Sequence, residues 1–268
     1  MIRKVMFIFA CVIVFSISVV SAQDTPPTFV LVHGAFQDAS GWAGVVANLE
    51  AEGYTTVTVE LAGRGEDTTP LGEITLDNYR DAVIEVIEAQ EQPVILVGHS
   101  FGGITISSVA EAIPDRIQAL VYLSAYLPRT EESLVSLSAQ DHYSVLGQEG
   151  NFILAEDFTY AAVLDTVFAS AFCPDCNEEQ LAAVAASQLN EPLAPLNTPV
   201  TLTPENFGSV RKVYILTSQD VVVSPQLQAL MIANTPVDHV YALDAGHAAY
   251  IIVPDALAAI LIKAASAE

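Results

Sequence analysis

Short apolar runs alternate with helical periodicity through the first half of the chain. β-branched and aliphatic residues gather in four runs, at 28–32, 55–59, 94–97 and 117–123. Between these runs, apolar residues recur three and four positions apart, as over 42–49 and 76–87, which predicts amphipathic helices. Strands that alternate with helices favour a mostly parallel sheet with helices on both faces.

The alternation stops between residues 128 and 207 and then resumes. This middle segment is loop-rich, and its Asn177 and Gln180 have the spacing of a capping box at the start of a helix. After it, the predicted strands are 213–217 and 240–243, and the predicted helices are 225–233 and 255–264. The simplest arrangement is an α/β core made of 23–127 and 208–268, with 128–207 inserted as a helical lid.

The first 22 residues have the features of a secretory signal peptide. Arg3 and Lys4 precede an apolar run over 5–15, and Val20-Ser21-Ala22 forms a small-residue cleavage site. The run is shorter than the roughly 20 residues that span a bilayer, which disfavours a permanent anchor. A lipid on Cys11 is disfavoured because too short an apolar segment precedes it. We therefore expect an exported protein, periplasmic or secreted, with no stable membrane association after cleavage.

Composition argues against several kinds of partner. The chain of 268 residues is 52% hydrophobic, so it can bury enough surface to fold. It has 32 acidic and 9 basic residues, a formal net charge of −23, and cleavage after residue 22 changes that charge to −25. Nucleic-acid binding needs clustered Lys and Arg, so no such partner is expected. The acidic surface disfavours anionic substrates, and the composition leaves the oligomeric state undecided.

The segment Gly98-His99-Ser100-Phe101-Gly102 lies between a predicted strand and a predicted helix. A serine at such a sharp turn has a strained backbone, and the residues two positions away must be nearly free of side chain for the turn to pack. The turn lifts the hydroxyl above the sheet edge, beside the N–H groups that begin the helix. We predict that Ser100 is a catalytic nucleophile.

A serine nucleophile needs a base, and the base needs an acid that orients it. Asp220 and His247 each follow a predicted strand, at the edge where ligand sites of α/β sheets collect. The other histidines fit the base less well. His239 precedes a strand, His142 lies in the insertion, and the side chain of His99 is expected to point away from the site.

Two alternatives concern the acid. Asp244 lies only three residues before His247, so it could serve only if the loop turned sharply. Asp220 could instead cap the helix that begins near Pro225. We predict Asp220 as the acid.

The oxyanion of a tetrahedral intermediate needs N–H donors. One is predicted at Phe101, directly after the serine, and the other at Ala35, in the loop after the first strand. Gly34 also suits a plain tight turn there. Gly34, Phe36 and Tyr126 are candidates for lining a substrate pocket, although isolated aromatic residues more often belong to the core.

Five segments resemble the α/β-hydrolase superfamily, and more narrowly its branch of plant methylesterases, hydroxynitrile lyases and related bacterial esterases. They cover about 28–127 and 211–262, and the likeness is weak across 128–207. The segments are TFVLVHGAFQDASGW, DNYRDAVIEVIEAQEQPVILVGHSFGG, LVYLSAYLP, LTSQDVVVSPQLQALMI and DAGHAAYIIVPDALAAIL. The resemblance implies an α/β-hydrolase fold with a lid. It also implies the same five site residues that the pattern of the chain had reached: Ser100, Asp220, His247, Ala35 and Phe101.

Two positions favour an esterase within that branch. Its hydroxynitrile lyases typically carry a threonine at the position of Gly34 and a lysine at the position of Ala248, and the resemblance therefore disfavours a lyase. Ser100 also separates this chain from dehalogenases and epoxide hydrolases of the superfamily, which use an aspartate at the turn. We expect a carboxylesterase that acts on a neutral small-molecule ester without metal or organic cofactor. A lyase, a perhydrolase and a weakly catalytic ligand-binding receptor are the alternatives.

Cys173-Pro174-Asp175-Cys176 resembles half of a redox or zinc site. No second pair of ligands follows at a suitable spacing, and the motif lies inside the insertion, away from a thioredoxin-like βαβ unit. In an exported protein a small disulfide between Cys173 and Cys176 is the preferred interpretation, with two free thiols as the alternative. So short a loop would contribute little to overall stability.

Overall fold

A six-stranded sheet forms the centre of the protein. The computed structural model describes residues 26–266, so the predicted signal peptide lies outside the described residues. The strands are β1 (Phe29–Val32), β2 (Thr56–Val59), β3 (Val94–His99), β4 (Ile117–Leu123), β8 (Lys212–Thr217) and β9 (His239–Leu243). Their order is β2-β1-β3-β4-β8-β9, and every neighbouring pair is parallel. The predicted parallel sheet is confirmed.

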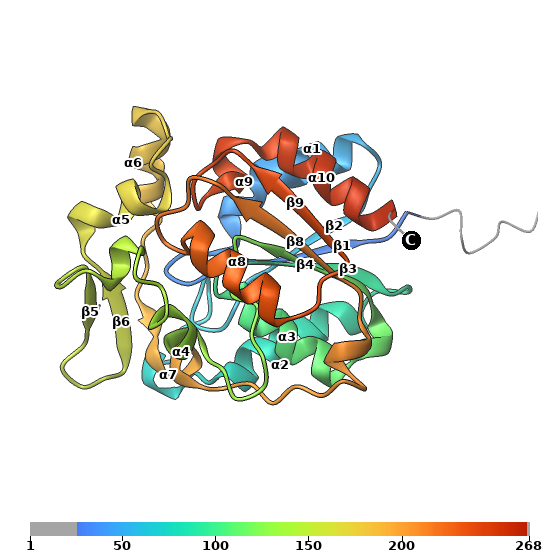
Figure 1. Ribbon diagram of the computed structural model, residues 1–268, viewed down its shortest axis with the longest axis horizontal. Coiled ribbons are helices and arrows are strands. Elements are labelled where there is room, and N and C mark those ends of the chain that lie inside the picture. Colours follow the sequence, from blue (N-terminus) through green and yellow to red (C-terminus); the bar gives the residue numbers. More distant parts are fainter. Residues whose placement is uncertain (1–25, 267–268) are drawn as a thin grey trace, which may run out of the picture.

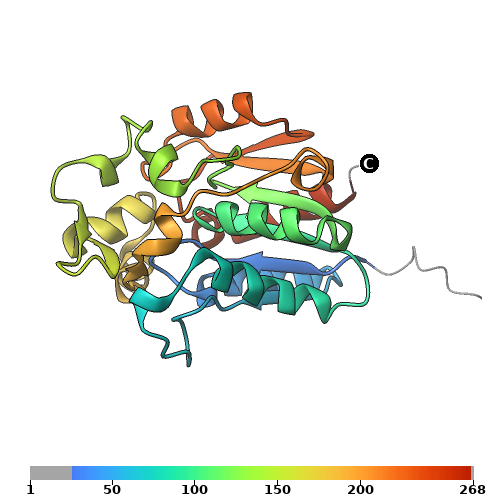
Figure 2. The same cartoon turned by 90° about the horizontal axis from the view of Figure 1, so that it is seen from below.

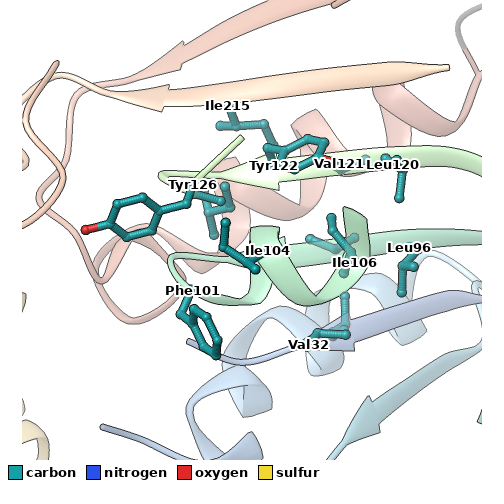
Figure 3. Close-up of a cluster of buried hydrophobic side chains, with 14 of the residues drawn as sticks. Val32, Leu96, Phe101, Ile104, Ile106, Leu120, Val121, Tyr122, Tyr126 and Ile215 are labelled. Atoms are coloured by element: carbon teal, nitrogen blue, oxygen red, sulfur yellow. The ribbon is translucent and has the colours of Figure 1, made fainter. Parts of the chain in front are cut away.

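The central strands are buried on both faces, which explains why their sequences are continuously apolar. Every residue of β1 and β3 is buried, and in β4 only Gln118 is exposed. Figure 3 shows side chains of these strands packed with residues of the helix that follows β3, among them Leu96, Ile104 and Ile106. This packing fixes the strand ends from which the polar side chains project.

Helices cover both faces of the sheet (Figures 1 and 2). One face carries α1 (Ala43–Ala51), α9 (Ala249–Ile252) and α10 (Pro254–Ser266), and the other carries α2 (Leu76–Glu88), α3 (Gly102–Ala112) and α8 (Pro225–Asn234). Thr75 caps α2 in a capping box and Ser224 caps α8. Short 3-10 helices occur at Ala39–Trp42, Leu71–Glu73, Pro114–Arg116, Val145–Gly147 and Phe207–Ser209.

The inserted segment projects from one end of the sheet, at the left of Figure 1. Its helices are α4 (Leu134–Ser138), α5 (Asp165–Phe172), α6 (Glu178–Ala186) and α7 (Leu193–Asn197). It also contains an antiparallel sheet of β5 (Phe152–Leu154), β6 (Tyr160–Val163) and β7 (Glu191–Pro192). The insertion, predicted to be helical and loop-rich, thus also contains short strands that the sequence did not indicate. These strands have two to four residues, too few for the alternation that identifies a strand in sequence.

Two further properties concern residues 26–266 only. In this part of the chain, no helix is both long and apolar enough to cross a membrane. In the same part, no three side chains of His, Cys, Asp or Glu come together as metal ligands would.

Candidate active site

Ser100 lies at the turn between β3 and α3 in a left-handed backbone conformation, with a φ of 54°. This conformation is rare for residues other than glycine and costs of order 1–3 kcal/mol. Backbone hydrogen bonds hold it: the Ser100 N–H donates to Leu123 O at 3.2 Å, and its carbonyl accepts from the N–H groups of Gly103 and Tyr126. The turn thus has the strained geometry that the sequence predicted for a nucleophile.

The glycines around Ser100 permit close packing of the backbone. A Cβ on Gly98 would lie 2.7 Å from the carbonyl oxygen of Gly102, and one on Gly102 would lie 2.9 Å from that of His33. Both distances are shorter than real Cβ atoms show. On the adjacent loop, a Cβ on Gly34 would lie 2.7 Å from the Cβ of Ser100.

His247 and Asp220 form a buried hydrogen-bonded pair. The Nδ1–H of His247 donates to Asp220 Oδ2 at 2.8 Å, and both side chains are inaccessible to solvent. Asp220 Oδ1 accepts from the N–H groups of Val222 and Val223, at 2.8 and 2.9 Å. With Nδ1 occupied, His247 Nε2 is the proton acceptor of the ring, and within 26–266 it has no hydrogen-bond partner. A carboxylate thus fixes the orientation and tautomer of a histidine whose other nitrogen is available.

The alternative assignments do not fit this geometry. Asp244 is exposed and accepts hydrogen bonds from Ser218 and Gln219 at the surface. The cap of α8 is Ser224, so Asp220 does not serve there. His142 is exposed in the insertion, and His239 begins β9 at the opposite end of the sheet.

His99 lies directly against His247, where the sequence had suggested a side chain turned away from the site. Its Nε2–H donates to the carbonyl oxygen of His247 at 3.0 Å, and the two ring centroids are 4.5 Å apart. Burial lowers the pKa of His99 well below its ordinary value, and the nearby His247 acts in the same direction. His99 is therefore a neutral support for the loop that carries His247.

The loop after β1, which we call the oxyanion loop (33–37), contains Ala35 beside the turn at Ser100. Within 26–266 no hydrogen bond is formed by the N–H groups of Ala35 or Phe101. His33 donates from Nδ1 to Gly34 O and accepts at Nε2 from the Leu61 N–H. Burial lowers the pKa of His33 to about 4. The ring is therefore neutral near pH 7, and its 3.6 Å contact with Glu60 is not an ion pair there.

A buried carboxylate from the insertion holds this loop. Glu191 accepts from the N–H of Phe36 at 2.8 Å and from the Tyr79 hydroxyl at 2.8 Å, and it pairs with the guanidinium of Arg64. Burial raises the pKa of Glu191, while Arg64 and the two donors act in the opposite direction. The backbone of Phe36 needs such support because its φ is 66°. Neither Arg64 nor Glu191 stood out in the sequence, since 127 positions separate them.

The pocket-lining role of Gly34, Phe36 and Tyr126 stays a prediction. The ring of Phe36 packs edge-on against Phe152 and Phe172 of the insertion. Tyr126 directs its hydroxyl away from the buried cluster of Figure 3. The ring of Phe101, whose N–H is the predicted oxyanion donor, packs edge-on against Tyr79 in the core.

The disulfide-closed turn (Cys173–Cys176) borders the same site. The structure joins Cys173 to Cys176. Just before this turn, the ring of Phe172 meets the ring of His247 edge-on, with centroids 5.2 Å apart. The motif is thus part of the surroundings of the histidine.

Two cavities of the described residues lie away from Ser100, which is only 5% exposed. A cavity of about 650 Å³ at the opposite end of the strands is lined by Pro27, Pro93, Pro114 and Arg211 among others. A second, of about 240 Å³, lies between the insertion and the core, beside Gln37 and Ser187. The candidate site is therefore identified by the strained serine and the buried Asp220–His247 pair.

The parallel sheet and the arrangement of Ser100, Asp220 and His247 are typical of one class of protein, the α/β hydrolases. Residues 29–260 match the model of the Alpha/beta hydrolase family, and the chain belongs to that family.

Within the family, the chain is similar to methylesterases and their relatives. It is 30% identical to Methylesterase 7 of Arabidopsis thaliana over 91% of this chain and 98% of that one. It is 32% identical to Alpha-hydroxynitrile lyase of Arabidopsis thaliana over 81% of this chain and 88% of that one. It spans 63% of the length of Putative methylesterase 11, chloroplastic, from the same plant.

Among solved structures, a variant of tomato Methylketone Synthase I complexed with beta-ketoheptanoate aligns with a TM-score of 0.80 and 25% identity. That alignment covers 90% of this chain and 98% of the other. The resemblance to the methylesterase branch, inferred from the motifs, is confirmed.

Proposed function

We propose that the protein is a serine esterase that hydrolyses small, neutral carboxylic esters. The observation that carries the proposal is the buried His247–Asp220 hydrogen bond of 2.8 Å. Ser100, held at a φ of 54°, directly follows His99, whose ring centroid lies 4.5 Å from that of His247. Methylesterases are among the relatives at about 30% identity over nearly the whole chain, which supports the same activity.

The proposed reaction is acyl transfer to water. His247 Nε2 takes the proton of the Ser100 hydroxyl as its oxygen attacks the ester carbonyl, and the alcohol leaves with that proton. The N–H groups of Ala35 and Phe101 stabilise the oxyanion. Water activated by the same histidine then cleaves the acyl-enzyme and restores the serine. Asp220 orients His247 and stabilises its charged form, and no step calls on a cofactor.

A hydroxynitrile lyase is the second candidate, since one relative carries that name. Lyases of this branch typically place a lysine directly after the catalytic histidine, and this chain has the fully buried Ala248 there. Lys212 is occupied elsewhere, because its ammonium group donates to the carbonyl oxygens of Phe207 and Val210. These contacts favour the esterase.

The test compares the wild-type protein with Ser100→Ala on p-nitrophenyl esters of graded acyl length. We expect the substitution to lower kcat by at least about a thousandfold, because the attacking oxygen is lost. Equal rates would refute the hydrolase, and ligand binding without turnover in either protein would point to a receptor. Cleavage of mandelonitrile without esterase activity would support the lyase, and peracid formation from acetate and hydrogen peroxide would support the perhydrolase.

We also propose that the protein is exported, to the periplasm or the medium, where oxidising conditions favour the Cys173–Cys176 bond. Its proposed partner is the ester substrate alone. Intact mass measured on protein from the producing cells is expected to correspond to a chain that begins at Gln23.

A further inference from the structure

We propose that the disulfide-closed turn (Cys173–Cys176) positions His247, and that Asp175 is the positioning residue through which it acts. The proposal rests on the proposed function, in which His247 is the base. It assigns a role to the cysteine motif, which the reaction itself does not use.

Two hydrogen bonds join this part of the insertion to the loop of His247, one on each side of that residue. Asp175 Oδ2 accepts from the N–H of Gly246 at 3.1 Å. The carbonyl oxygen of Phe172 accepts from the N–H of Ala248 at 2.8 Å. His247 is therefore flanked by two hydrogen bonds to the insertion, one accepted by a side-chain carboxylate and one by a backbone carbonyl, 71 and 76 residues away in sequence.

The turn also packs closely against Gly246, on the side where another residue would carry its Cβ. A Cβ on Gly246 would lie 2.7 Å from the Cδ of Pro174 and 2.8 Å from Asp175 Oδ1. So short a separation leaves no room for water or a side chain between the turn and the loop. A displacement of the turn is therefore transmitted directly to the backbone next to His247.

The disulfide fixes where Asp175 lies. Asp175 and Pro174 are themselves exposed, whereas Cys173 at the base of the turn is fully buried. The turn is closed by the S–S bond and by a hydrogen bond from the Cys176 N–H to Cys173 O at 3.2 Å. A loop this short removes little chain entropy from the unfolded state, so local geometry is its main contribution.

The experiment measures kcat and KM for Asp175→Ala, Asp175→Asn and the double variant Cys173→Ser/Cys176→Ser. We expect kcat to fall roughly 3- to 30-fold in Asp175→Ala and in the double cysteine variant, with KM changed less than about twofold, because the base is misplaced while the pocket is intact. Asp175→Asn keeps an acceptor oxygen and should retain most of the rate. Thermal midpoints are measured alongside and should stay close to that of the wild type.

The matched control is Asp157→Ala. Asp157 is an exposed aspartate of the same insertion that accepts hydrogen bonds from Thr159 and contacts no part of the His247 loop. We expect wild-type kcat for this variant. A loss equal to that of Asp175→Ala would show a general loosening of the insertion and would overturn the proposal.

Reduction of the Cys173–Cys176 disulfide provides an independent test of the proposal. Dithiothreitol supplies two electrons and two protons to the S–S bond and becomes its own cyclic disulfide, leaving two new thiols per chain. The reduced wild type should match the double cysteine variant, which itself should not respond to the reagent. Combining Asp175→Ala with the cysteine changes should lower kcat no further, because both remove the same contact.

Additive losses, or wild-type kcat in every variant, would overturn the proposal. If those variants are unaffected while Ser100→Ala is inactive, the positioning role fails and the esterase stands. If Ser100→Ala is as active as the wild type, the proposed function itself fails.

Discussion

The insertion holds two loops of the core next to Ser100, and it does so by opposite means. The oxyanion loop (33–37) is fixed by Glu191, which is buried together with Arg64 at the centre of a charged network. The histidine loop (244–248) is fixed by Asp175, an exposed carboxylate on a disulfide-closed turn. The contact of Glu191 belongs to a buried ion pair. The contact of Asp175 is a hydrogen bond from an exposed side chain, on a turn that a disulfide closes.

The difference has a physical consequence for how each contact can fail. Removing one partner of a buried ion pair leaves an uncompensated charge, so the network at Glu191 is either complete or strongly destabilising. The hydrogen bond of Asp175 can break without stranding a charge, because Asp175 is exposed and its carboxylate stays hydrated. We therefore expect disruption at the oxyanion loop to lower the free energy of unfolding, and disruption at the histidine loop to lower kcat.

The largest expected effect is on the buried pair. Glu191→Ala should lower the free energy of unfolding by about 3–5 kcal/mol, because Arg64 is left buried without a counter-charge. Urea unfolding measures this, with Asp175→Ala as the control, for which a change of about 0.5 kcal/mol or less is expected. The double variant Arg64→Met/Glu191→Leu should regain part of the loss. Equal losses for Glu191→Ala and Asp175→Ala would remove the contrast.

The next effect depends on pH, and it compares two buried histidines: His33, which begins the oxyanion loop, and His99, which supports the histidine loop. His33 has its pKa lowered to about 4 by burial, so between pH 6.5 and pH 4 the unfolded chain binds a proton there that the folded one does not. Stability should therefore fall as the pH drops through this window, by at most roughly 3 kcal/mol from His33.

Urea unfolding at several pH values checks this, with His33→Gln expected to flatten the slope. His99 has its pKa lowered by burial in the same direction, so His99→Gln is expected to flatten the slope too, down to lower pH. A slope unchanged in both variants would mean that these histidines are protonated in the folded protein.

Gly34 and Gly246 allow a comparison of how rigid the surroundings of the oxyanion loop and of the histidine loop are. A Cβ at Gly34 meets Ser100 in the packed core, whereas a Cβ at Gly246 meets the exposed Pro174 and Asp175. Gly34→Ala should therefore cost about 1–3 kcal/mol in stability by overpacking. Gly246→Ala should cost less, since the turn can shift outward, and should lower kcat as Asp175→Ala does. A larger loss of stability in Gly246→Ala than in Gly34→Ala would mean that the surroundings of the histidine loop are the more rigid.

The smallest effect concerns one hydrogen bond of the buried network. Tyr79→Phe removes the hydroxyl that donates to Glu191 but leaves Arg64 and Phe36 bonded to it. We expect a loss of about 1 kcal/mol in the free energy of unfolding, typical of one hydrogen bond. A loss as large as that of Glu191→Ala would mean that Tyr79, and not the charge pair, holds the network together.

The sequence predicted the elements that obey a period or a local rule. The alternating core followed from runs that fill a two-sided sheet, and the turn at Ser100 followed from glycines that packing requires. Asp220 and His247 could be proposed because strand ends of a parallel sheet meet at one edge. The contacts that hold the loops of the site in place could not be predicted. Glu191 reaches Phe36 across 155 positions, and His99 contacts His247 across 148, with no motif to connect either pair.

Burial of the proposed reacting groups has a consequence for covalent labelling. Ser100 exposes 5% of its surface and His247 none, so little of either residue is open to a reagent in this conformation. A ligand that needs a more open conformer binds with its intrinsic affinity multiplied by the population of that conformer, so a population of about one in a hundred weakens binding about a hundredfold. The rate at which a serine-directed covalent reagent inactivates the protein therefore reports how accessible Ser100 is.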